Sequence, residues 1–258
     1  MKLNHHSISA LIARGVAVLT VLAAAGCAYN ETLGRNQLLF VSQGQMAELA
    51  SSAWADLKKQ EPITTDPKYV NRVKRVAPKI IRAAGGNPAE WEVQVFKSDQ
   101  LNAFALPGGK IGFYTGILDM MENDDQIAAV MGHEVAHVNF NHSGERYSQT
   151  AAAQTALGAG GAIAGGSQVG GAAMQALGLG AQVGLLLPFS RKHELEADKF
   201  GVRYMASAGY NPNEAVKFWE KMSASKSGAP PEFLSTHPSD ATRIAQLKRE
   251  IALLNSGS

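Results

Sequence analysis

The chain has 258 residues, 45% of them hydrophobic and 18% charged, a composition that supports one or two domains with a buried core and argues against intrinsic disorder. It carries 24 Lys and Arg against 22 Asp and Glu, and two of the basic residues, Lys2 and Arg14, precede the cysteine at position 27. Without that leader the formal charge is zero, which argues against a nucleic-acid-binding surface. The single cysteine excludes an intrachain disulfide and a zinc site built from cysteines.

Residues 1–26 have the features of an export signal. Two basic residues frame an N-terminal region that is followed by a small and apolar run at 15–25, which is too short for a membrane-spanning helix. The run ends in AAGC at 24–27, which resembles the lipobox of bacterial lipoproteins, with Ala where Leu is more common. We therefore predict lipidation of Cys27 and a periplasm-facing position in the bacterial envelope, and Ala28 favours the outer membrane. The alternative is an ordinary secretory signal followed by a chance cysteine.

Beyond the leader we treat residues 27–42 as a tether and residues 43–258 as one domain. Apolar residues recur at the three- and four-residue spacing of helices, and shorter stretches alternate as strands do. Three short strands beside seven or so helices predict a mostly helical α+β fold with a small three-stranded sheet. The expected helices are 43–59, 66–84 (bent or divided at Pro78), 126–140, from 190 to about 207, 213–224 and 239–254, and the expected strands are 91–96, 102–106 and 110–114.

Between residues 147 and 190 the chain has no charged side chain and is rich in Ala and Gly. Small residues let helices approach closely in lipid, so a transmembrane hairpin is one interpretation. Four glutamines interrupt the stretch, and Ala and Gly contribute little transfer energy. We therefore favour tightly packed small-residue helices or a mobile flap over the core.

Residues 133–137 read HEVAH. Positions i and i+4 share one face of a helix, so His133 and His137 can bind one metal ion, and imidazole is a favoured zinc ligand. Glu134 is placed to deprotonate a water that the metal activates. The flanks of this helix are apolar, where two imidazoles and a carboxylate are costly unless a metal satisfies them.

A catalytic zinc site needs a third protein ligand and an open position. The expected ligand is Glu194, because Asp198 lies four residues later on the same helical face and can accept the spare N–H of a ligand histidine. Glu196 points about 200° away from Glu194 and is a weaker candidate. His193 is the other competitor.

These motifs together resemble the M48 zinc metallopeptidases, which are gluzincins, and in particular their small lipoprotein and mitochondrial-type members. HExxH is followed on a later helix by ExxxD at 194–198, within SRKHELEAD. GRNQLLFVS at 34–42 resembles the family's entry segment, NAFALPGG at 102–109 its edge strand beside the cleft, and LSTHP at 234–238 with Arg243 its late His-Pro motif. The resemblance covers most of residues 34–250.

The resemblance implies one Zn²⁺ held by His133, His137 and Glu194, with Glu134 as general base and then as proton donor to the leaving amine. Asp198 would support a ligand histidine. His237 would lie over the open position, either to stabilise the oxyanion or to act as a fourth ligand that keeps the enzyme latent. A third interpretation is that His-Pro only caps the final helix.

The segment Asn102, Ala103, Phe104 and Ala105 is expected to bind substrate. An edge strand binds an extended peptide through main-chain groups, which suits unfolded proteins of varied sequence. An ordinary buried strand is the alternative. His142 lies five residues after His137, about 140° from the ligand face, so we expect it behind the ligands or at the surface.

We therefore predict a lipid-anchored zinc endopeptidase that degrades or trims misfolded envelope proteins. The rival hypothesis is an envelope assembly factor that holds client proteins or a partner complex, with a latent or mainly structural zinc. Glu134 favours the enzyme because a structural zinc does not need it, whereas the uncharged stretch and a His237 lid favour regulation or binding.

Overall fold

The computed structural model describes residues 27–163, 189–224, 232–237 and 241–256, with the backbone alone at 154–163 and at 232. The expected leader at 1–26, most of the uncharged stretch at 147–190 and the start of the last expected helix lie outside these residues. The predictions for them remain as stated.

The chain described here begins with a β-hairpin. Strand β1 (Cys27–Asn30) pairs antiparallel with β2 (Arg35–Leu38), and Gly34 lies in the connecting turn with a φ of 65°. Gln37 on β2 is buried and donates to the carbonyl of Phe140 at 2.7 Å. The segment treated above as a tether thus contains a hairpin that contacts the domain.

Two amphipathic helices follow the hairpin. Helix α2 (Gln43–Gln60) begins with a reciprocal capping box between Ser42 and Gln45, and α3 (Pro67–Ala83) begins at Asp66, whose carboxylate accepts from the N–H of Lys68. Helix α3 continues through Pro78, so of the two expected alternatives, a bend or a division, the division is wrong. Its apolar face, which is buried, holds it together despite the lost backbone hydrogen bond: Val73, Val76, Ala77, Ile80 and Ile81.

The predicted sheet is present. Strands β3 (Glu92–Phe96), β5 (Lys110–Tyr114) and β4 (Ala103–Leu106) lie in that order, with β3 parallel and β4 antiparallel to β5. The short helix η1 (Pro88–Glu90) precedes β3. In the middle strand Gly112 leaves room for the ring of Phe104, which would lie 2.4 Å from an added Cβ. Because β5 is the middle strand, β4 lies at one edge of this sheet.

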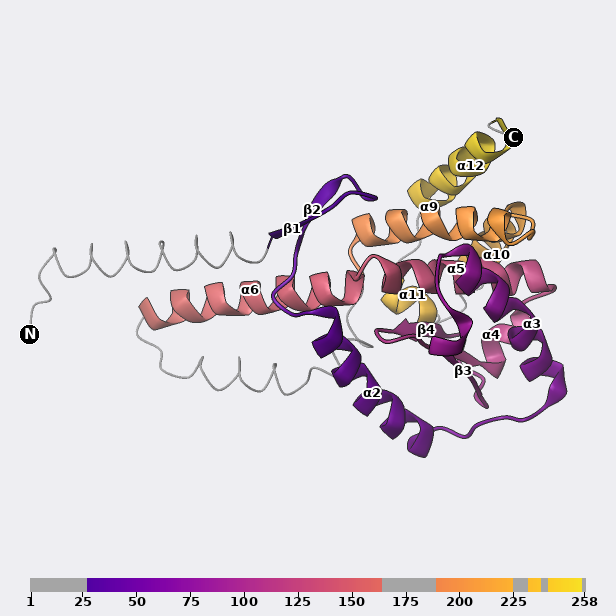
Figure 1. Ribbon diagram of the computed structural model, residues 1–258, viewed down its shortest axis with the longest axis horizontal. Helices are drawn as coiled ribbons and strands as arrows, with labels where there is room; N and C mark the ends of the chain where they lie inside the picture. Colours follow the sequence, from indigo (N-terminus) through magenta and orange to yellow (C-terminus); the bar gives the residue numbers. More distant parts are fainter. Residues whose placement is uncertain (1–26, 164–188, 225–231, 238–240, 257–258) are drawn as a thin grey trace, which may run out of the picture.

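Helix α5 (Asp124–Asn139) lies at the centre of the domain. Twelve of its 16 residues are buried, and it packs against α3, β4, α9 (Arg191–Ser207) and α10 (Asn213–Ala224). The final helix α12 (Ala241–Ser256) packs on α9 and α10. In Figure 1, α5 and α9 run alongside each other above the sheet, whereas α6 (His142–Ile163) projects away from the body. The short helices α4 (Thr115–Met120) and α11 (Glu232–Thr236) complete the described elements.

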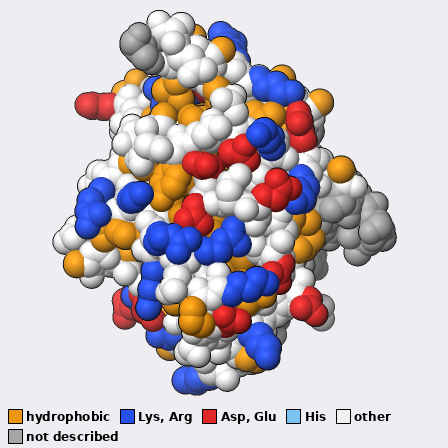
Figure 2. All heavy atoms as spheres, turned by 90° about the vertical axis from the view of Figure 1, so that its right-hand side faces the viewer, with side chains coloured by type: hydrophobic (Ala, Val, Ile, Leu, Met, Phe, Trp, Pro, Cys, Tyr) orange, Lys and Arg blue, Asp and Glu red, His pale blue; other side chains and the backbone are white. Residues whose placement is uncertain are grey.

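The α+β fold class predicted from the pattern of elements is confirmed. Lys and Arg side chains are interspersed with Asp and Glu on the face in Figure 2, in keeping with the nearly balanced charge, and no histidine shows there. Within the described residues, no helix combines the length and the apolar character needed to cross a membrane.

Candidate metal centre

Helix α5 supplies three of the candidate residues. Its N-terminus is capped by Asn123, whose side chain accepts from the N–H of Gln126 at 3.0 Å, and two aspartates in the first turn suit the helix dipole. Further along this helix, His133, Glu134 and His137 are each 1% exposed. The i and i+4 spacing brings the two imidazoles together, with Nε2 of His137 3.0 Å from Nε2 of His133.

Helix α9 supplies the carboxylates and separates the three candidates for the third ligand. Glu194 and Asp198 are buried on the side that faces α5, where Glu194 lies 3.4 Å from Nε2 of both His133 and His137. Glu196 turns away and pairs with Arg35 at 2.6 Å. His193 lies 3.2 Å from a carboxylate on α6, outside the group. The structure therefore brings Glu194, and neither competitor, to the histidine pair.

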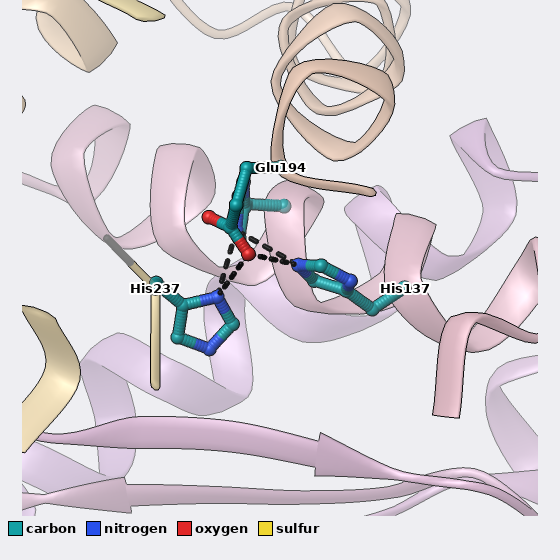
Figure 3. A group of neighbouring side chains, drawn as sticks. His137, Glu194 and His237 are labelled. Atoms are coloured by element: carbon teal, nitrogen blue, oxygen red, sulfur yellow. Dashed lines mark hydrogen bonds and ion pairs between the residues drawn. The ribbon is translucent and has the colours of Figure 1, made fainter. Parts of the chain in front are cut away.

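His237, the histidine of the late motif, belongs to the same group. Nδ1 of His237 lies 3.2 Å from Nε2 of His133 and 3.1 Å from Oε1 of Glu194. Figure 3 shows the rings of His137 and His237 turned toward the carboxylate of Glu194. One ligand atom from each of His133, His137, Glu194 and His237 lies within 4.8 Å of the other three, and all four side chains are buried.

The donor set fits a tetrahedral metal such as zinc. Bonds of about 2.0–2.1 Å place tetrahedral ligand atoms about 3.3 Å apart, and the separations given above run from 3.0 to 3.4 Å. His133 donates its Nδ1–H to Asp198, since a carboxylate only accepts, so in the neutral ring Nε2 presents a lone pair to the other ligand atoms. Buried acceptors that face one another need a cation between them.

The charges around His133 also favour the binding of a cation. Burial disfavours the charged imidazolium, but the carboxylates of Glu194 and Asp198 outweigh it and raise the pKa of His133 to about 9. In the same site burial lowers the pKa of His137 well below its ordinary value. The group therefore attracts a cation, and a proton and a metal compete for the same nitrogen of His133.

Arg243 stabilises the carboxylates of Glu194 and Asp198. Its guanidinium lies 2.6 Å from Glu194 and donates two hydrogen bonds of 2.7 Å to Asp198, over the ring of Trp219 at 4.2 Å. Burial would raise the pKa of Glu194 and of Asp198, but the Arg243 charge, with the nearby histidines, lowers both. Both side chains are therefore held as carboxylates.

Glu134 lies between the ligand group and the sheet. Its Oε2 accepts from the N–H of Ala105 on β4 at 3.0 Å, and its Oε1 lies 3.3 Å from Nε2 of His237. Burial raises its pKa above the ordinary value of a glutamate. A carboxyl that is held by one oxygen, with a raised pKa and the other oxygen facing the ligands, is suited to accepting a proton.

The expected substrate strand borders this site in part. A cavity of about 20 Å³ lies beside Glu134 and His237, and Asn102, Phe104 and Ala105 line it. Ala103 does not, because its side chain is fully buried in the main core. Binding of a peptide along β4 stays a prediction.

Several residues of the site were not found from the sequence. Phe189, just before α9, stacks on His137 with ring centroids 3.8 Å apart, and the guanidinium of Arg146 lies 4.0 Å above the Phe189 ring. Both also line the small cavity. The lack of charge at 147–190 gave no sign of Phe189, and Arg146 lies just before that stretch among ordinary polar residues.

His142 is buried and its Nδ1 lies 3.0 Å from Nδ1 of His137. The angular argument assumed a continuous helix, whereas α5 ends at Asn139 and Asn141 has a φ of 50°, which interrupts the helix. His142 then begins α6 and faces back toward the ligands. Of the two positions expected for it, the structure favours the one behind the ligands.

Comparisons with known proteins agree on a family. A model described as "Peptidase family M48" matches residues 67–251. The chain is 39% identical over 196 residues to "Mitochondrial metalloendopeptidase OMA1" of Schizosaccharomyces pombe, which covers 69% of this chain and 54% of that protein. It is 31% identical over 238 residues to the human "Metalloendopeptidase OMA1, mitochondrial" (84% of this chain, 44% of that protein). It is 28% identical over 215 residues to the "Beta-barrel assembly-enhancing protease" of Escherichia coli strain K12 (81% and 44%). The chain thus spans about half the length of the curated relatives it matches.

Proposed function

The chain belongs to peptidase family M48, and on that premise we propose that it is a zinc-dependent endopeptidase. The family resemblance drawn from the motifs is confirmed. The observation that carries the proposal is the convergence of four buried ligand atoms beside a buried glutamate. His133, His137 and Glu194 would hold the zinc, and Asp198 would orient His133. When bound, the zinc would supply a Lewis acid that activates water and polarises the scissile carbonyl.

Glu134 would act as the general base. The N–H of Ala105 holds its Oε2, so that Oε1 faces the ligand group and is the atom that accepts the proton from the attacking water. Its raised pKa suits it to keep that proton until it is delivered to the leaving amine.

His237 would act as a fourth ligand in a resting state. Its Nδ1 is close to two of the proposed ligands, and the cavity of about 20 Å³ beside it is too small for a peptide. Substrate binding along Asn102, Phe104 and Ala105 would then require His237 to move away. This arrangement supports a latent enzyme over an oxyanion role for His237.

The proposed substrates are unfolded or misfolded proteins of the bacterial envelope, and the proposed anchor is a lipid on Cys27. The leader supports export, and one relative is named as a β-barrel assembly-enhancing protease, although the OMA1 relatives are named as mitochondrial. An envelope assembly factor with a rarely used zinc is the second candidate, and the position of His237 among the ligands favours it.

The test compares the purified full-length protein with Glu134→Gln on unfolded casein, with zinc content measured in both. Glu134→Gln keeps the shape and the hydrogen bond from Ala105 but cannot take a proton, so cleavage should fall at least about 100-fold while zinc content stays the same. The control is Glu220→Gln, which removes an exposed partner of Lys248 and should cleave normally. Equal cleavage by Glu134→Gln would refute the mechanism.

A further inference from the structure

A chain of buried polar contacts leads from the N-terminal hairpin to His137. Arg35 on β2 donates to Glu196 from Nε at 2.6 Å and from Nη2 at 2.7 Å. Glu196 lies 3.1 Å from Nε2 of His142, and Nδ1 of His142 lies 3.0 Å from Nδ1 of His137. The side chain of Glu196 is 15% exposed, that of Arg35 10% and that of His142 fully buried, so water has little access to these contacts.

The carboxylate of Glu196 determines the direction of the hydrogen bonds in this series of contacts. The carboxylate of Glu196 can only accept, so Nε2 of His142 carries a proton and, in the neutral ring, Nδ1 is an acceptor. His137 must then donate from Nδ1. Its lone pair is thereby placed on Nε2, the atom that lies 3.4 Å from Glu194 and 3.0 Å from Nε2 of His133.

Arg35 in turn holds the carboxylate in place. Its guanidinium also forms two hydrogen bonds with Glu145 on α6, at 2.7 and 2.8 Å, and Glu145 accepts from Gln37 and lies near His193. A planar guanidinium that pairs with two carboxylates through two bonds each fixes their relative orientation. The hairpin is thus linked to both α6 and α9.

We propose that His142, oriented by Glu196 and Arg35, is a positioning residue that fixes the tautomer and ring orientation of His137, so that metal affinity depends on the N-terminal hairpin. The inference rests on the proposed function, in which His137 is a zinc ligand. His142 thereby does for His137 what Asp198 does for His133. The hydrogen-bond acceptor for His133 is the carboxylate of Asp198, whereas the acceptor for His137 is the neutral imidazole of His142.

The experiment measures zinc affinity of the full-length protein by competition with a chromophoric chelator. His142→Phe keeps a ring but removes the acceptor, and it should weaken zinc binding about 10–100-fold. His142→Asn keeps a carbonyl oxygen near the position of Nδ1 and should recover most of that loss. A residue that only fills space would show the opposite order, because Phe fills the site better than Asn.

Two further variants test the contacts that Glu196 and Arg35 make beyond His142. Glu196→Gln is isosteric, but its amide can donate to His142 and so removes the tautomer preference, and Arg35→Gln frees the carboxylate. Each should weaken zinc binding several-fold, and both provide the test if His142→Phe does not fold, as judged by circular dichroism and melting. The control is Arg203→Gln, which is also on α9. It breaks the partly exposed pair with Glu250 of α12 and should not change zinc affinity.

The outcomes separate the two hypotheses. Wild-type protein that binds no zinc would refute the proposed function. Wild-type protein that binds zinc, with folded His142→Phe and Glu196→Gln binding it equally well, would overturn only the role of His142. A greater loss of affinity in His142→Asn than in His142→Phe would assign His142 to packing.

Discussion

At the scale of single residues, His237 contacts both the metal-ligand atoms and the proposed general base Glu134. Its Nδ1 lies among the ligand atoms and its Nε2 lies 3.3 Å from Oε1 of Glu134. A fourth ligand occupies the position that a catalytic zinc must leave open, and a contact with Glu134 engages the oxygen proposed to accept the proton. His237→Ala should therefore raise the rate of casein cleavage several-fold, measured as initial rates at equal zinc content.

The double variant Glu134→Gln, His237→Ala is the control and should be inactive, which would show that the added activity comes from the same site. A rate that falls at least about 100-fold in His237→Ala alone would assign an oxyanion role instead. An unchanged rate would remove His237 from the mechanism.

At the scale of elements, two glycines let the ligand-bearing helices touch. An added Cβ on Gly132 of α5 would lie 2.9 Å from the carbonyl oxygen of Gly201 on α9, and one on Gly201 would lie 2.9 Å from the backbone nitrogen of His133. Both positions meet backbone, which cannot move aside as a side chain does. The approach of α5 to α9 is what brings Glu194 to the histidine pair.

Gly201→Ala should therefore push the helices apart. Overpacking costs about 1–3 kcal/mol and outweighs the gain of about 1 kcal/mol that Ala brings to a helix interior, so urea unfolding should show a loss of stability. Zinc affinity should fall about tenfold, because the distances between the ligands depend on this contact.

Gly44→Ala on α2 is the matched control, since the nearest atom to its added Cβ is 3.9 Å away. It should leave zinc affinity unchanged and stability equal or slightly higher. If Gly201→Ala behaves like Gly44→Ala, close packing of these two helices does not determine the site.

The elements also show how far the sequence could be interpreted. Repeats of three and four residues depend on local burial, so α2, α3 and α5 were predicted nearly to the residue, and HExxH predicted that His133 and His137 meet. Glu194 was found because Asp198 lies four residues later on the same helical face, where it can support a ligand histidine.

Arg35 could not be found in this way. Its partners Glu145 and Glu196 lie 110 and 161 residues away, and no local pattern indicates which distant carboxylate an arginine will meet. The choice between the two positions expected for His142 stayed open for a related reason, since a residue with a positive φ lies where the periodicity would have continued the helix. Contacts that depend on a local break in a helix or on distant packing are absent from the periodicity of a sequence.

At the scale of the whole molecule, the hairpin joins the proposed lipid anchor to the catalytic domain. Cys27 is exposed at the start of β1, and Arg35 on β2 is bound to α6 and α9. A lipid on Cys27 would therefore hold the domain close to the membrane surface, on a paired hairpin that contacts the ligand-bearing half of the protein.

This arrangement makes Cys27→Ser a test of how the molecule is attached. Acyl chains contribute about 0.8 kcal/mol per buried methylene, so the wild-type protein, expressed in a bacterial host with its own leader, should be found with the membranes. The Cys27→Ser variant, preceded by a cleavable secretory leader in place of residues 1–26 so that cleavage does not need the thiol, should be found in the soluble periplasmic fraction. Glu134→Gln with the native leader is the control and should stay with the membranes. Membrane retention of the Cys27→Ser variant would count against the lipid anchor and direct attention to residues 147–190, because that uncharged stretch is the other segment considered for contact with lipid.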